Sequence, residues 1–157
     1  MDVELQLAVE NLLSRYVHAL DEGRLEDWPE MFVESGRYRI TTAENHERGL
    51  PLSVLYADSR AMLRDRVTAL RHANIYEAQR YRHTVSSTLV ERRGANSVSA
   101  VSHFQAVRIM HSGESMLFAT GRYLDVIRVN GAGAPQFEEK IVVCDSRRFD
   151  TLLAIPL

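Results

Sequence analysis

The feature that most restricts the fold of this chain is a change of period, from helical spacing at the start to alternation after residue 36. Between Glu4 and Leu20 the apolar residues recur at intervals of three and four, as on one face of a helix. They are Leu5, Ala8, Val9, Leu12, Leu13, Tyr16, Val17 and Leu20. After Asp21-Glu22-Gly23, a short helix with Trp28 among its apolar residues is predicted, and then a strand over Gly36–Thr42. This order is expected where helices close the mouth of one curved sheet.

The remainder of the chain is predicted to hold one more helix and four long strands. The polar segment 41–56 is predicted to be a loop, and Asp58 or Ser59 is a candidate N-cap for a helix through about Ala73. The strands are predicted over Tyr81–Glu91, Ser97–Met110, Ser115–Val129 and Gln136–Asp145. A shift of the apolar phase near Ala100-Val101 predicts a β-bulge. Long strands with tight returns favour an α+β fold, in which a cone-like, strongly curved antiparallel or mixed sheet holds helices in its concave face.

Composition excludes several functional classes. A length of 157 residues predicts a single domain over residues 1–157. The net charge of −2 offers no basic field for nucleic acid, and no apolar run approaches the length of a membrane span. The start of the chain lacks a basic leader with an apolar core, so a cytoplasmic location is expected. The single cysteine, Cys144, excludes an internal disulfide and a cluster held by several thiolates of this chain.

Several strands contain apolar runs without alternation, which predicts that both faces of the sheet are covered. Such runs are Met116–Ala119, Val126-Ile127 and Ile141–Cys144. Because helices cover only the concave face, the convex face is expected to meet a second protein surface, in an obligate oligomer. The residues expected to contribute to subunit contacts are Val126, Ile127, Ile141, Val143, Leu152, Leu153, Ile155 and Leu157.

The predicted helix before Ala73 also carries a row of arginines: Arg60, Arg64, Arg66 and Arg71. Such a row is most often a solvated face. It can also be a basic rim for an acidic partner, and on that interpretation Arg64 and Arg66 are candidate subunit contacts.

No motif in the chain predicts a metal site or a nucleophile. None of the six histidines forms a metal-ligand spacing with a suitable acid. The best catalytic candidates are Asp21 as a base with His83 and Tyr16, near the predicted mouth of the cone. The competing interpretation is that Asp21 caps a turn and His83 satisfies a backbone group, and spacing alone favours this one.

Blocks along nearly the whole chain resemble the small (β) subunits of aromatic-ring-hydroxylating dioxygenases, in particular those of the terephthalate dioxygenase type. They include Ala73-Asn74-Ile75-Tyr76-Glu77, Arg80-Tyr81-Arg82-His83, Arg108-Ile109-Met110-His111, Gly121-Arg122-Tyr123-Leu124-Asp125 and Val143-Cys144-Asp145-Ser146. The resemblance implies a cone-shaped fold like nuclear transport factor 2 (NTF2) and ketosteroid isomerase. It also implies an assembly of three large and three small subunits.

In that family the large subunit carries the Rieske [2Fe-2S] cluster, the mononuclear Fe(II) and the substrate pocket. The sequence is therefore interpreted as a non-catalytic subunit without a cofactor of its own. The complex is expected to cis-dihydroxylate an aromatic acid or hydrocarbon with O2 and electrons from NADH. Two alternatives stay open here: a free-standing lyase or isomerase using Asp21 and His83, and a module that binds a small apolar ligand.

Overall fold

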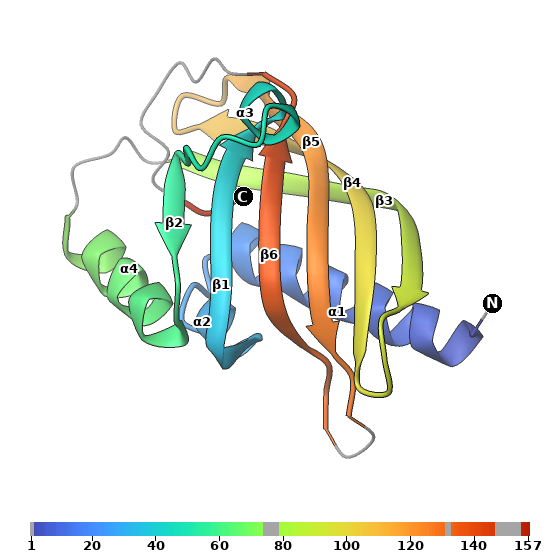
Figure 1. Ribbon diagram of the computed structural model, residues 1–157. Helices are drawn as coiled ribbons and strands as arrows, with labels where there is room; N and C mark the ends of the chain where they lie inside the picture. The colour runs from blue at the N-terminus through green and yellow to red at the C-terminus, as the bar shows by residue number, and fades with distance from the viewer. Residues whose placement is uncertain (1, 74–78, 131–132, 147–154) are drawn as a thin grey trace.

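The computed structural model describes residues 2–73, 79–130, 133–146 and 155–157 (Figure 1). Its helices are α1 (Val3–Asp21), α2 (Asp27–Glu30), α3 (Ala43–Glu47) and α4 (Arg60–Ala73). Its strands are β1 (Phe32–Thr42), β2 (Leu55–Ala57), β3 (Gln79–Arg92), β4 (Ser97–Met110), β5 (Ser115–Arg128) and β6 (Gln136–Cys144).

The strands form one curved six-stranded sheet in the order β2-β1-β6-β5-β4-β3. β1 and β6 run parallel, whereas the other neighbouring pairs run antiparallel. α1 crosses the sheet on its concave side, behind the strands in the view of Figure 1. The predicted α+β class and the curved sheet that holds its helix on the concave side are confirmed.

α1 owes its position to one apolar face and a well-defined cap. The side chain of Asp2 accepts a hydrogen bond from the backbone N–H of Leu5 at 3.1 Å, which satisfies a donor that the helix leaves unpaired. The inward face is fully or almost fully buried and consists of Val9, Leu12, Leu13, Tyr16, Ala19 and Leu20. The helix ends at Asp21, two residues before Gly23, whose φ of +73° suits glycine.

β1 begins four residues earlier than predicted, because its pairing with β6 contains an irregularity. The register shifts between Phe32 and Arg37, so the first part of the strand does not alternate in sequence. Gly36 lies within this irregularity, where a Cβ atom would stand 2.8 Å from the Cβ of Phe32. The close approach explains why a residue without a side chain is present.

Two further predictions about local structure are wrong. The segment 41–56 is not simply a loop, since it contains α3 and most of the edge strand β2, which pairs with β1. β4 itself has no extra residue at Ala100-Val101, and its pairing with β5 continues unbroken from Ser97 to Ala106. The irregularity beside Val101 lies in the pairing with β3, where the register shifts between Ser86 and Leu89. The apolar pattern shifts there because Val101 is an apolar residue on the outer face. Each of the three antiparallel pairs from β3 to β6 contains one register shift. These shifts place an extra residue in β3, in β5 and in β6.

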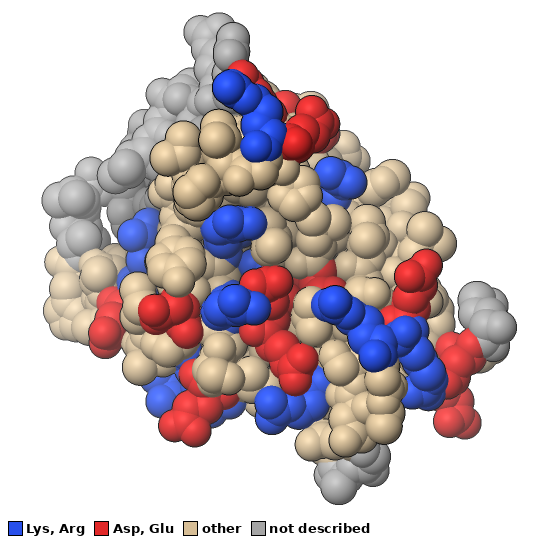
Figure 2. Space-filling model, in the orientation of Figure 1, with Lys and Arg blue, Asp and Glu red and all other residues tan. Residues whose placement is uncertain are grey.

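The apolar runs that predicted a covered convex face do not make that face apolar throughout. Along β5 burial alternates, with Tyr123, Asp125 and Ile127 buried and Leu124 and Val126 only half-buried. Figure 2 shows the side of the sheet opposite α1, where side chains of both charges lie among uncharged surface. The outer face is therefore mixed, and the apolar residues on it form a narrower strip.

That strip follows the register across four strands, from Leu89 through Val101 and Leu124 to Ile141. Leu89 is exposed, and the other three are half-buried. We call these four residues, with Val126 beside them, the outer strip.

Candidate functional site

The interior of the cone is filled by aromatic rings around one buried ion pair. Lys140 Nζ lies 3.1 and 3.2 Å from the two carboxylate oxygens of Asp125, and both side chains are completely buried. The ammonium also lies 3.7 Å from the centre of the Tyr123 ring and 4.4 Å from that of Tyr16. The negative faces of these rings stabilise the cation inside an apolar core.

Burial shifts the titration of both partners. Desolvation lowers the pKa of Lys140 to about 8, although the neighbouring carboxylate opposes this shift. Desolvation likewise raises the pKa of Asp125, against the influence of Lys140. The sequence analysis missed this pair. Its signal was present: Asp125 and Lys140 face each other across inward-facing positions of two apolar strands.

The structure does bring the predicted Asp21 and His83 together. The two Asp21 carboxylate oxygens accept hydrogen bonds from the His83 backbone N–H at 2.8 Å and the ring Nδ1 at 2.6 Å. The His83 side chain has no exposed surface, and that of Asp21 is 4% exposed. Asp21 thus joins the end of α1 to β3. A substrate would have no access to this pair as it stands.

Tyr16, the third predicted catalytic residue, has a different partner. Its hydroxyl donates a hydrogen bond to a backbone oxygen of Leu157 at 2.5 Å. Complete burial raises the pKa of Tyr16 well above its ordinary value, so the hydroxyl stays protonated. Tyr16 therefore acts as a donor to the backbone and not as part of a triad with Asp21.

The residues expected at subunit contacts fall into several groups. Val126 and Ile141 are half-buried on the outer strip. Ile127 and Leu157 are fully buried in the core of this chain, and Val143 is fully buried within the chain but outside that core cluster. Ile155 is partly buried and packs against the same core, whereas Leu152 and Leu153 lie outside the described residues.

The arginines of α4 contact acidic residues of the same chain. Arg64 forms an ion pair with Glu30 at 2.8 Å, and Arg71 forms one with Glu26 at 2.8 Å. Arg66 is half-buried and also has a partner. These contacts join α4 to α2, so part of the arginine row holds two helices of the same chain together.

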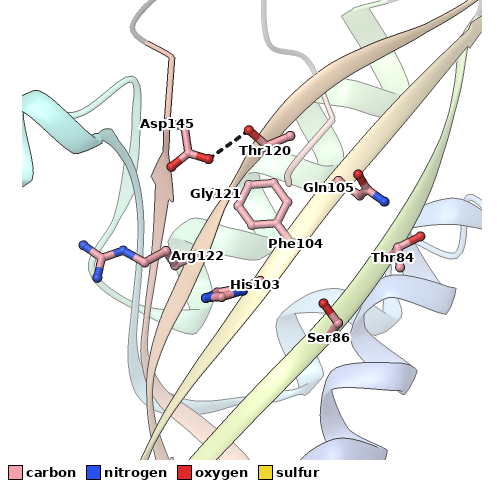
Figure 3. A pocket seen from close by; sticks show the side chains of 9 residues that line it. All are labelled: Thr84, Ser86, His103, Phe104, Gln105, Thr120, Gly121, Arg122 and Asp145. Atoms are coloured by element: carbon pink, nitrogen blue, oxygen red, sulfur yellow. Dashed lines mark hydrogen bonds between the residues drawn. The ribbon is translucent and has the colours of Figure 1, made fainter.

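A polar hollow of about 430 Å³ opens on the outer face beside the outer strip (Figure 3). It crosses β3, β4 and β5 and ends at Asp145, which accepts a hydrogen bond from Thr120 at 2.9 Å. Arg122 and His103 lie side by side in the register of β4 and β5. Within the described part of the chain, neither side chain forms a hydrogen bond or an ion pair.

No group of three or more His, Cys, Asp or Glu residues in the described part of the chain could hold a metal ion. No described helix is both long and apolar enough to cross a membrane.

Comparison with known proteins identifies the family. The sequence model described as "Ring hydroxylating beta subunit" matches residues 15–151, which is most of the chain. The chain belongs to this family. Among curated ring-hydroxylating β subunits, it is 42% identical to "Terephthalate 1,2-dioxygenase, terminal oxygenase component subunit beta 1" of Comamonas sp.. That alignment of 154 residues covers 98% of each chain.

Two further relatives agree. The chain is 37% identical to the small subunit of anthranilate 1,2-dioxygenase from Burkholderia cepacia, over 99% of this chain and 96% of that one. A crystal structure assigned to the β subunit of an aromatic-ring-hydroxylating dioxygenase from Novosphingobium aromaticivorans superposes with a TM-score of 0.89 and 33% identity. It covers 98% of this chain and 97% of that chain. The predicted family and the NTF2-like fold are confirmed, and the free-standing lyase or isomerase is not favoured.

Proposed function

We propose that this chain is the non-catalytic small subunit of an oxygenase whose large subunit carries the Rieske cluster, the mononuclear iron and the substrate pocket. The observation that carries this proposal is the match over 98% of each chain to a subunit of a terminal oxygenase component. The match extends over nearly the full length of both chains, which supports the proposal of a single-domain subunit. We also propose that this subunit is located in the cytoplasm.

The filled interior supports a role without chemistry of its own. Trp28, Tyr16, Tyr38 and Tyr123 are fully buried where an NTF2-like enzyme would need an open pocket. The pair of Asp21 and His83 is also closed off. Neither residue lines the polar hollow on the outer face.

The proposed reaction of the complex is the cis-dihydroxylation of an aromatic carboxylic acid, with O2 and electrons from NADH. The two curated relatives above are named for terephthalate and anthranilate, which are both aromatic carboxylates. An aromatic acid is therefore favoured over a hydrocarbon as the substrate of the assembly.

The proposed contact surface of this subunit is the outer strip together with the polar hollow beside it. Ile141, Val126 and Leu124 offer apolar area, and Arg122 offers a guanidinium that has no partner within the described residues. An interface with an apolar centre and a polar rim has this composition. We propose three copies of the chain in an assembly with three large subunits.

The test is to produce the chain alone and together with a Rieske-type large subunit, and to supply NADH and a reductase. O2 uptake and product formation from terephthalate and anthranilate are then measured. We expect co-purification in equal amounts, activity only in the complex, and none in the chain alone. Turnover of a ring compound by the isolated chain, abolished by Asp21→Asn, would refute the proposal.

A further inference from the structure

The outer face continues past the polar hollow, on the side away from the outer strip. The register places Arg82, Val107 and Leu117 in one row there, with Arg80 and Ile109 in the next. The residues between these positions on β3 and β4 are buried, so the named side chains lie on the outer face. Leu117 is exposed, and Val107 and Ile109 are half-buried. These three apolar residues are here called the second patch.

Three arginines of this region have no acidic partner in the described part of the chain. Arg80 and Arg82 are exposed on β3, and Arg122 is half-buried at the hollow (Figure 3). None of the three forms a hydrogen bond or an ion pair with a described residue. Arg37 on the same face, by contrast, pairs with Glu139 at 2.9 Å. The three guanidinium groups are therefore available to another molecule.

The strands around these arginines contain no acidic residue. Asp and Glu are absent from the segments 80–86, 103–109 and 115–122. Asp145 lies at the end of the hollow, where it already accepts a hydrogen bond from Thr120. Because the whole chain has a net charge of −2, this positive region is a local feature and does not follow from the composition. A positive region on a slightly acidic protein is complementary to a partner surface with negative groups.

We propose that this region of the outer face receives an acidic surface of the large subunit, with one carboxylate on Arg122 and another on Arg82. Apolar side chains of the large subunit pack on the outer strip and on the second patch, on the two sides of the hollow. A guanidinium group binds a carboxylate through two parallel hydrogen bonds, which fixes position as well as charge. This inference rests on the proposed function, since it needs a large subunit that covers the outer face.

Charge reversal tests whether the two arginines meet negative groups. We expect Arg82→Glu and Arg122→Glu each to weaken binding to the large subunit about tenfold, and raised salt to weaken the intact complex more than the variant complexes. Arg15→Glu is the matched control, because Arg15 is an exposed arginine of α1 that pairs with no described residue. It changes the net charge equally and should leave the affinity unchanged. Biolayer interferometry measures the affinities, and equal melting temperatures show that the variants are folded.

Cross-linking identifies the chemical group that the partner presents. Lys140 is the only lysine of the sequence and is completely buried, so a lysine placed on the outer face is the one exposed lysine of the chain. A carbodiimide joins a lysine amine to a carboxylate in contact with it, forming an amide while the reagent takes up water and becomes a urea. We expect Arg82→Lys and Arg122→Lys to become linked to Asp or Glu residues of the large subunit, as identified by mass spectrometry. Arg15→Lys should give no such link.

The outcomes separate this inference from the proposed function. If the complex forms but neither lysine variant is linked to an acidic residue of the large subunit, the inference is overturned and the proposed function stands. Links to a second copy of this chain, or affinities unchanged by both charge reversals, would overturn it in the same way. If the intact chain forms no complex with the large subunit, both fail.

Discussion

At the scale of single residues, the buried pair of Lys140 and Asp125 is the most unusual feature of this β subunit. Two charges in a core cost free energy to desolvate, and their mutual attraction only partly offsets that cost. The pair is retained in a cage of Tyr16, Tyr123 and Phe137. The contribution of the pair to stability can be measured, because removing one partner is expected to destabilise the fold whereas removing both is not.

Lys140→Met should lower the free energy of unfolding by about 3–5 kcal/mol, because it leaves the Asp125 carboxylate buried without a partner. Lys140→Met combined with Asp125→Leu should be close to the wild type or more stable. Urea unfolding of the three chains, followed by circular dichroism, measures both values. A double variant as unstable as the single one would show that the pair is a net source of stability.

At the scale of elements, the junction of β5 and β6 depends on one missing side chain. A Cβ atom on Gly121 would lie 1.9 Å from the Val143 carbonyl oxygen, and backbone cannot move aside as a flexible side chain can. Gly121→Ala should therefore cost at least about 3 kcal/mol of stability, at the upper end of overpacking effects. Gly94→Ala is the matched control, since nothing lies within 4 Å of its Cβ position. Equal melting temperatures for the two variants would contradict the argument.

The contact between α2 and α4 predicts a dependence of stability on pH. The hydrogen bonds from Arg71 hold the pKa of Glu26 at about 2, below its ordinary value of 4.5. The unfolded chain therefore binds more protons than the folded chain between these two values, so the contribution is present above pH 4.5 and is lost as the pH falls toward 2. Arg71→Met should reduce the change in melting temperature with pH over this interval, relative to the intact chain. If the melting temperature of the variant changes with pH as it does in the intact chain, the pair of Arg71 and Glu26 contributes nothing to stability in solution.

Elements with strong local signals were predictable, whereas those that depend on distant partners were not. Ser59 does cap α4, since its hydroxyl accepts a hydrogen bond from the Met62 N–H at 3.2 Å, and β4 has the bounds predicted for it. The one predicted bulge was assigned to β4, whereas the extra residue lies in β3, between the residues that pair with Val101 and His103, because an irregularity belongs to a pair of strands and not to one sequence. β2 was missed because three residues at a sheet edge have no periodicity of their own.

At the scale of the whole molecule, the outer strip should decide assembly. Ile141→Glu and Val126→Glu place a charge on half-buried positions of this face. Each should reduce co-purification with the large subunit by tenfold or more, corresponding to about 1.4 kcal/mol or more of binding free energy. Pull-down at constant salt and size-exclusion chromatography report the loss. Leu7→Glu, at an exposed position of α1, is the control and should leave the assembly intact.

Arg64→Glu offers a less clean test of the same assembly. It breaks the ion pair with Glu30 in this chain before it affects any partner, so weaker co-purification would have two causes. This internal role could not be foreseen from the sequence, because Glu30 and Arg64 lie 34 residues apart and only the packing of α2 beside α4 joins them.

The sequence by itself determined the family, the class of fold and the order of the longer helices and strands, because these depend on local periodicity and on long blocks of similar residues. The tertiary structure decided which residues meet: Asp125 with Lys140, Asp21 with His83, and Leu157 with Tyr16 and Tyr38. It also decided which apolar residues face outward, since Ile127 and Val126 are neighbours in sequence on opposite faces of the sheet. Curvature and strand register set those contacts, and both arise only when segments far apart in the chain pack together.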